Sequence, residues 1–363
     1  MDKENKDISR DERLLLESRW HQKNPDNDTT PLDAMIIRLK TECKKHNSKR
    51  PLHLDLRGIT LFHKDLSNLD LSGYDFSHAN LNQCNLSSSN LSYTKFHYTS
   101  MEQSLLDECE FLGSDLYHAS LNECSAKGCG FGGANLTHAR LIHANLTNVT
   151  LSRSQLINAD LRASNLENAR LSEADLSGAI FTRSKLLQSD LKKSNVKGTN
   201  FELADMQGCR LLGIQNFKKA KWIGTDIRGL DLRGAYLVRR YIADENYLYE
   251  FQMSSRFHRI IYLLWRASSD CGRSLFRWFV WLALITFLFG LIYTQLDIDY
   301  GDHKTILSPI YFSIVTVTTL GYGDAVPASL AAQIFVILQA ITGYMGLGGL
   351  LSILGNKMAR RAE

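Results

Sequence analysis

A five-residue period from residue 56 to residue 211 constrains the fold of this chain more than any other feature. Every fifth position is apolar, 32 times in succession, and the set comprises 22 Leu, six Phe, two Met, one Val and one Ala. Two residues before most of them stands a small side chain, as in Ala79, Cys84 and Ser89. Neither a helix nor a flat strand buries one side chain in five. The period therefore predicts a chain that turns a corner every five residues, with Leu or Phe inside and small residues at the corners.

The residue between the small and the large side chain is often Asn or Asp, as in Ala79-Asn80-Leu81. This pattern resembles the pentapeptide-repeat family. The resemblance implies a right-handed quadrilateral β-helix with four repeats per coil, hence eight coils for the 160 residues from 52 to 211. Coils stacked about 4.8 Å apart would form a rod of about 40 Å.

The pentapeptide-repeat domain is expected to span residues 51–238. Its period slips by one near Asn216, and a further coil is predicted because the period resumes at Trp222, Ile227, Leu232 and Leu237. A solenoid needs caps on its end coils. Residues 1–50 are predicted to be an N-terminal cytosolic helical cap, in which Thr30-Pro31 starts a helix. The first apolar cluster of the chain is too short and too acid-flanked for a signal peptide.

Two uncharged segments nearer the C-terminus are long enough to cross a membrane. Residues 278–296 carry no charge over 19 positions, and residues 325–356 carry none over 32. We expect transmembrane helices at 278–296 and 328–358, and a cytosolic tail at 359–363. Between them, a stretch beginning at residue 307 is too short to cross, with Ser308 as N-cap and Pro309 in the first turn. It is predicted to be a re-entrant half-helix surrounded by protein.

Directly after this half-helix comes the heptapeptide Thr318-Thr319-Leu320-Gly321-Tyr322-Gly323-Asp324. Glycine permits backbone angles that a Cβ would forbid, so such a strand can present carbonyl oxygens that replace the water shell of a cation. The order of helix, half-helix, glycine-rich strand and helix makes the motif specific. The alternative is a plain two-helix anchor with a glycine turn.

Residues from about 278 to 361 resemble the pore domain of bacterial-type potassium channels with two transmembrane helices, on the motif at 316–324. The resemblance implies a homotetramer, a pore helix and selectivity filter at 307–324, and bound K⁺ with no organic cofactor. It assigns the K⁺-coordinating filter to Thr319, Leu320, Gly321, Tyr322 and Gly323. The ion-facing carbonyls are implied on the first four of these residues, with Thr319 Oγ at the innermost site. The positions implied to support the filter are occupied by Thr316, Thr318, Asp324, Tyr311, Phe312 and Val315. The implied gating hinge and inner pore comprise Gly343, Tyr344, Leu347, Gly348 and Leu351, and Gly346 and Gly349 leave the choice of hinge open.

Two departures from the family pattern concern the support of the filter. Many members carry a Trp pair in the pore helix, whereas this chain has Tyr311 and Phe312, and Phe312 has nothing to donate. Some members place a Glu behind the filter, whereas this chain has Val315. We expect selectivity to survive both changes, and the stability of the conducting filter to be the property at stake.

The distribution of charge predicts the orientation in the membrane. The positive residues that flank the two segments are Arg266, Arg273, Arg277, Lys357, Arg360 and Arg361. The loop between the segments holds Asp297, Asp299, Asp302 and Asp324 against Lys304 and His303. A multi-pass protein of the inner cell membrane with both termini in the cytoplasm is therefore expected. The loop acids could concentrate cations at the pore mouth, or be ordinary solvated residues.

Residues 239–277 are expected to link the rod to the pore. Residues 247–251 and 257–266 mix aromatic residues with arginines, which favours an interfacial amphipathic helix in contact with membrane lipids. An elbow at 268–274 would lead into the first membrane helix. This linker could transmit motion of the rod to Gly343, or be a rigid joint.

Charge and cysteine usage exclude several classes of function. Residues 51–238 contain 19 acidic and 19 basic residues, with a balance of −7 up to Glu123 and +7 from Ser125 onward. A neutral rod argues against DNA mimicry, and no nucleic-acid partner is expected. The basic half would suit the anionic inner leaflet, a neighbouring rod, or no partner. We interpret the cysteines at the small position as compact fillers, not metal ligands or disulfides: Cys84, Cys109, Cys124, Cys129 and Cys209.

Three hypotheses about function follow, and no constellation of residues predicts an enzyme. The first is a potassium-selective channel that a cytosolic repeat domain gates, assembles or docks. The second is a membrane-anchored pentapeptide-repeat scaffold with little conductance. The third is a tethered inhibitor of a DNA enzyme. The gating stimulus (ligand, pH, membrane tension or none) and any cytosolic ligand or protein on the β-helix stay open.

Overall fold

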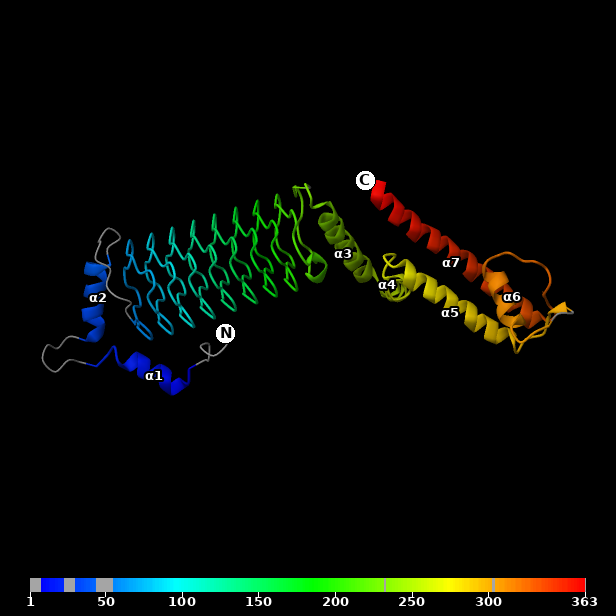
Figure 1. The fold of residues 1–363 in the computed structure, drawn as a ribbon, viewed down its shortest axis with the longest axis horizontal. Helices are drawn as coiled ribbons and strands as arrows, with labels where there is room; N and C mark the ends of the chain where they lie inside the picture. The colour runs from blue at the N-terminus through cyan, green and yellow to red at the C-terminus, as the bar shows by residue number, and fades with distance from the viewer. Residues whose placement is uncertain (1–7, 23–29, 44–54, 232, 302–303, 363) are drawn as a thin grey trace. The chain divides into compact units, whose positions relative to one another are not determined.

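The computed structural model describes residues 8–22, 30–43, 55–231, 233–301 and 304–362 (Figure 1). Its contacts divide the chain into two compact units, Met1–Tyr247 and Leu248–Glu363. The expectations for Leu232, Asp302 and His303 lie outside the described residues, as do those for the side chains of Lys357, Arg360 and Arg361.

Residues 55–231 form a β-helix, as the five-residue period predicts (Figure 1). Each repeat contributes one bridge residue and one tight turn, and the parallel bridges pair residues 20 apart, from Asp55↔Asp75 to Asn195↔Gln215. A coil therefore takes four repeats. Backbone hydrogen bonds join successive coils, as in Leu81 N–H to the Ser100 carbonyl at 2.7 Å.

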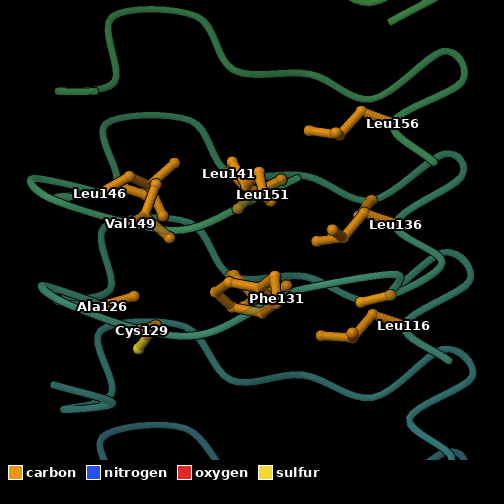
Figure 2. Packing of buried hydrophobic residues seen from close by; sticks show 14 of the residues in the cluster. Leu116, Ala126, Cys129, Phe131, Leu136, Leu141, Leu146, Val149, Leu151 and Leu156 are labelled. Atoms are coloured by element: carbon orange, nitrogen blue, oxygen red, sulfur yellow. The ribbon is translucent and has the colours of Figure 1, made fainter. Parts of the chain in front are cut away.

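The large apolar residues of the repeats fill the interior of the coils. All 32 of them are at most 1% exposed, from Leu56 to Leu211. Figure 2 shows Leu116, Leu136 and Leu156 stacked as one column, one residue from each of three successive coils. The sequence-based assignment of the inward positions is therefore confirmed throughout this stretch.

The slip in the period corresponds to one inserted residue. After Gln215 the bridges pair residues 21 apart, as in Asn200↔Lys221. Asn216 takes a left-handed backbone conformation with φ 59°, and a short 3₁₀ helix, η1 (Phe217–Lys219), follows it. Trp222 then re-enters the core and stacks on Phe201 with ring centroids 4.6 Å apart.

The β-helix ends earlier than residue 238. The last bridge is at Asp231, and helix α3 (Tyr236–Ser254) begins five residues later. The prediction that Leu237 continues the period is wrong, because this residue lies in the first turn of α3 and is 69% exposed. Instead, Val238 and Ile242 of α3 are buried in the core that the last coils share.

Two helices lie at the N-terminal end of the rod: α1 (Arg10–Ser18) and α2 (Pro31–Glu42). Thr30 caps α2 through a reciprocal pair of hydrogen bonds with Asp33, so the helix expected after Thr30-Pro31 is present. Leu39 of α2 is fully buried in the same core as the first coils. The carbonyl of Cys43 accepts a hydrogen bond from Asp70 N–H at 2.6 Å, which ties the end of α2 to the β-helix.

Among the described residues, four helices lie wholly within the second unit: α4 (Arg256–Ser269), α5 (Leu275–Tyr293), α6 (Ser308–Val317) and α7 (Leu330–Ala362). Strand β1 (Ile298–Asp299) pairs antiparallel with β2 (Val326–Pro327). By length and composition, Leu275–Tyr293 and Leu330–Gly355 can each cross a membrane. Both expected membrane segments are therefore helical, with ends shifted by a few residues.

The start of α6 differs from the prediction by one residue. Ser308 is the first helical residue and Leu307 holds the N-cap position without a side-chain hydrogen bond. Ser308 Oγ instead accepts the backbone N–H of Thr305 at 2.8 Å. The serine therefore caps the turn before the helix, while Pro309 sits in the first turn as expected.

Candidate functional site

Helix α6 contacts both α5 and α7, and a glycine permits each close approach. A Cβ on Gly290 of α5 would lie 3.2 Å from the Cα of Ile310. A Cβ on Gly343 of α7 would lie 2.6 Å from the carbonyl oxygen of Val317. Since Val317 ends α6, the backbone of α7 touches this helix at the point where the glycine-rich motif begins.

The motif leaves α6 through a series of overlapping turns. Thr318 N–H donates to the Ile314 carbonyl at 3.0 Å, and Leu320 N–H donates to the Val315 carbonyl at 3.1 Å. Thr316 and Thr318, the predicted supports, direct their hydroxyls to carbonyls of α6 rather than to residues 319–323. Within one chain, these threonines therefore stabilise the helix end.

The backbone of the motif alternates in handedness. Thr319, Gly321 and Gly323 take positive φ angles of 58°, 53° and 77°, whereas Leu320 and Tyr322 do not. Positive φ is uncommon for a residue with a Cβ, so Thr319 holds backbone strain. A backbone that alternates in this way turns its N–H groups to one side and its carbonyls to the other. The side chains of Leu320 and Tyr322 are 58% and 66% exposed.

Tyr311 supports the end of the motif. Its hydroxyl donates a hydrogen bond to Oδ2 of Asp324 at 2.7 Å. Phe312 is buried instead and packs edge-on against Tyr293, with ring centroids 5.2 Å apart. Val315 is also buried. Sequence reasoning placed Tyr311 among the filter-support positions, as a departure from the Trp pair, but did not foresee that its hydroxyl reaches the Asp324 carboxylate.

The glycines of α7 fall into two groups. Gly343, Gly346 and Gly349 face other helices, because added Cβ atoms would lie within 2.6 Å of Val317, Leu282 and Trp278, respectively. Trp278 Nε1 also donates to the Gly346 carbonyl at 2.8 Å. By contrast, nothing lies within 4 Å of a Cβ added to Gly348. Of the predicted inner-pore residues, Tyr344 and Leu351 are exposed and Leu347 is partly exposed.

Helix α4 has the amphipathic surface that the sequence predicts for the linker. Phe257, Ile260 and Leu264 are exposed, and no acidic residue occurs in Arg256–Ser269. The elbow after it, Asp270 to Gly272, consists of three consecutive residues with positive φ. Trp281 Nε1 donates to the Ala267 carbonyl at 3.1 Å and so ties the end of α4 to α5.

The cysteines at the small position of the β-helix are buried, and four of them, Cys84, Cys109, Cys129 and Cys209, donate a hydrogen bond to a backbone carbonyl. Sγ of Cys84 bonds the Leu61 carbonyl at 2.6 Å, and Sγ of Cys129 bonds the Leu106 carbonyl at 2.8 Å. Burial raises the pKa of Cys84 to about 11 and that of Cys124 to about 12, so these thiols stay protonated. Across the described ranges, no three His, Cys, Asp or Glu side chains gather as metal ligands.

Comparison with protein families assigns both parts of the chain. Residues 99–176 match the pentapeptide repeat region, and residues 65–107 and 169–208 match pentapeptide repeats. Residues 279–360 match the ion channel family. The chain therefore carries pentapeptide repeats in its N-terminal part and an ion-channel domain near its C-terminus, and neither is an enzyme family.

Relatives of the ion-channel domain include known potassium channels. Two-pore potassium channel 1 of Arabidopsis thaliana is 33% identical over 97 residues, which are 26% of this chain and 27% of that protein. The A-type voltage-gated potassium channel KCND3 of Rattus norvegicus is 30% identical over 116 residues, 32% of this chain and 17% of the relative. The chain thus spans under a third of the length of these relatives.

Solved structures similar to the chain are pentapeptide-repeat proteins. One of them is HetL of the cyanobacterium Nostoc, a protein involved in heterocyst differentiation regulation. It is 24% identical, and the match covers 53% of this chain and 95% of the HetL chain, with a TM-score of 0.24. QnrB1, a plasmid-mediated fluoroquinolone resistance protein, is 20% identical and covers 51% of this chain and 95% of its own, with a TM-score of 0.33.

Proposed function

We propose that the protein is a potassium-selective channel in which four copies surround one pore. Each copy would contribute the backbone of residues 319–323, so that rings of carbonyl oxygens replace the water around K⁺. The observation that carries this proposal is the alternating backbone of Thr319, Gly321 and Gly323 directly after α6. Its support comes from the match to ion channels and from potassium-channel relatives.

The surroundings of this strand favour a cation. The C-terminal end of α6 is the negative pole of its dipole, and it would face the cavity below the strand. Asp324 adds a carboxylate at the opposite end, which the Tyr311 hydroxyl orients. In the tetramer, exposed side chains such as those of Leu320 and Tyr322 would pack away from the ion, between neighbouring copies and helices.

We place the channel in the inner cell membrane with both termini in the cytoplasm. Arginines precede α5, and aspartates occupy the loop between the two membrane-length helices, which is the asymmetry of a cytoplasmic N-terminus. The exposed apolar residues of α4, with its arginines, would lie among the headgroups of the inner leaflet. The β-helix would then be cytosolic, where it gates, assembles or docks the pore or binds an unidentified partner.

Ion flux in liposomes tests the channel directly. Full-length protein is expected to carry K⁺ down its gradient, whereas Gly321→Asp is expected to carry none, because an Asp cannot adopt the required φ without strain and places a fixed carboxylate in the strand. A correctly folded tetramer that passes no K⁺ under any condition would favour the membrane-anchored scaffold instead.

A further inference from the structure

A chain of buried hydrogen bonds joins α5, α6 and α7 beside the glycine-rich motif. Tyr293 Oη of α5 donates to Gln339 Oε1 of α7 at 2.6 Å. Gln339 Nε2 donates to the carbonyl oxygen of Ser313 in α6 at 3.0 Å and to Ser313 Oγ at 2.5 Å. Ser313 Oγ donates onward to the Thr286 carbonyl of α5 at 2.6 Å. The Gln339 amide thus uses both its N–H groups and its oxygen.

This burial belongs to the single chain. Gln339 and Ser313 are 0% exposed and Tyr293 is 1% exposed with no second copy present, so assembly is not needed to bury them. A polar side chain at membrane depth is costly unless it is paired, and such groups tend to serve function. A Leu at position 339 would fill a similar volume without that cost. The presence of Gln therefore indicates a role for its hydrogen bonds beyond packing.

The hydrogen bonds of Gln339 lie next to the contact between Gly343 and Val317. Gln339 contacts Ser313, and Gly343 contacts Val317, so two contacts lie one helical turn apart on both α6 and α7. Val317 immediately precedes Thr318, the first residue of the motif. Helix α7 is therefore fixed to the base of the proposed filter at two points.

We propose that Gln339 is a positioning residue that couples the inner helix to the filter and stabilises its conducting form. The inference rests on the proposed channel function. Phe312 cannot donate a hydrogen bond and Val315 carries no carboxylate, so besides the Tyr311–Asp324 hydrogen bond we assign support behind the filter to the inner helix. A shift or rotation of α7 would displace Ser313 and Val317 together. The displacement of Val317 would pass directly to Thr318, the next residue and the first of the motif.

Single-channel recording of the full-length protein in bilayers tests this coupling. Gln339→Leu keeps the volume and removes every hydrogen bond of the amide, so conducting bursts are expected to shorten about three- to tenfold, the effect of one buried interhelical hydrogen-bond group in a membrane. Gln333→Leu is the matched control, because Gln333 lies on the same helix with an exposed side chain. Its bursts are expected to equal those of the wild type.

Gln339→Glu separates positioning from mere packing. A carboxylic acid buried at this site stays protonated at neutral pH, and can then donate to Ser313 and accept from Tyr293. Raising the pH ionises it and removes the donor, so burst length is expected to fall with pH in this variant. The wild type, which has the same Tyr293, is the control for any titration of the tyrosine.

The outcomes distinguish this inference from the channel itself. Unchanged bursts in both leucine variants, in a conducting protein, would overturn the role of Gln339 and leave the channel standing. A wild type without current would overturn the proposed function. If Gln339→Leu does not assemble, Tyr293→Phe decides, since it removes one hydrogen bond only. A two- to threefold shortening is expected there, about the effect of a single bond, and no change contradicts the coupling.

Discussion

The β-helix and the helical unit bury their apolar residues in opposite ways. In the β-helix, each coil closes over its own large side chains, and none of the 32 inward residues exceeds 1% exposure. In the helical unit, large side chains such as Phe276 and Leu330 are more than 70% exposed. The first unit completes its core within one chain, whereas the second needs lipid or further copies to cover it.

The two units also use positive φ angles differently. In the β-helix they recur at the same turn of successive repeats, as at His138, His143 and Asn148, where the chain rounds a corner toward solvent. In the helical unit they alternate at Thr319, Gly321 and Gly323 on consecutive odd positions. The first pattern serves closure of a coil. The second serves the direction of carbonyl groups, which is why the functional proposal rests on it.

The largest expected effect would come from a cavity in the rod. Phe131→Ala removes a ring that stacks on Phe111 with centroids 4.5 Å apart, and should lower the free energy of unfolding of the β-helix by about 3–5 kcal/mol. Thermal unfolding of the full-length protein, monitored by the circular-dichroism signal of its β-structure, measures this loss of stability. Leu112→Ala is the control, since Leu112 is exposed and should change stability by less than about 0.5 kcal/mol. Equal effects of the two would show that the interior is not close-packed.

Next in size is a steric test at the junction of α6 and α7. Gly343→Ala places a Cβ 2.6 Å from the Val317 carbonyl oxygen, and overpacking against backbone costs about 1–3 kcal/mol, so flux should fall sharply. Gly348→Ala meets no atom and should raise helix stability by about 1 kcal/mol. Flux and thermal stability of the two variants, measured together, decide between them. If Gly348→Ala is the more damaging change, Gly348 is the hinge, not a neutral position.

A smaller effect is expected from Tyr311→Phe. It removes the hydrogen bond to Asp324 and nothing else, a contribution of about 1 kcal/mol at an exposed site. The current should then inactivate faster while K⁺ selectivity is retained. Tyr300→Phe serves as the control, because among the described residues the Tyr300 hydroxyl donates only to the Tyr293 carbonyl, at 3.3 Å. Identical inactivation of wild type and Tyr311→Phe would remove Tyr311 from the support of the filter.

The smallest expected effect concerns acid and the N-terminal helices. The side chain of Arg57, and further that of Arg19, holds the pKa of Asp55 below its usual range despite partial burial. A carboxyl whose pKa is lower in the folded than in the unfolded state stabilises the fold at pH values above its unfolded-state pKa. This contribution is therefore lost as the pH falls below about 4. The protection of the α1 amides against hydrogen exchange, measured relative to their intrinsic exchange rate at each pH, should therefore fall in acid. Asp55→Asn should already show fast exchange at pH 7, and a slow, unchanged rate there would contradict the ion-pair argument.

The sequence was sufficient for most of the β-helix because its signal is local. One inward residue in five, with a small residue two positions before it, fixes each coil regardless of the rest of the chain. The sequence-based prediction failed at Leu237. There the five-residue period continues in the sequence, but the backbone is already helical in α3. A pattern of apolar residues at spacing five cannot tell a last coil from the first turn of a helix.

The candidate site was predictable as a motif but not as a set of contacts. The order of α5, α6, motif and α7 follows from hydropathy and glycine spacing. The Tyr311–Asp324 and Gln339–Ser313 hydrogen bonds join residues 13 and 26 positions apart, and depend on how three helices pack. Ser308 shows the same limit on a small scale, because its hydroxyl caps a neighbouring turn instead of its own helix.

The reversal potential of the full-length protein in a planar bilayer tests the central claim most directly. With a tenfold K⁺ gradient and Na⁺ replacing K⁺ on the dilute side, a K⁺-selective pore should reverse at about 59 mV, with the sign of the K⁺ equilibrium potential. A reversal potential near zero would mean that Na⁺ passes as readily as K⁺. That result would contradict a carbonyl filter at residues 319–323, whatever the rod does.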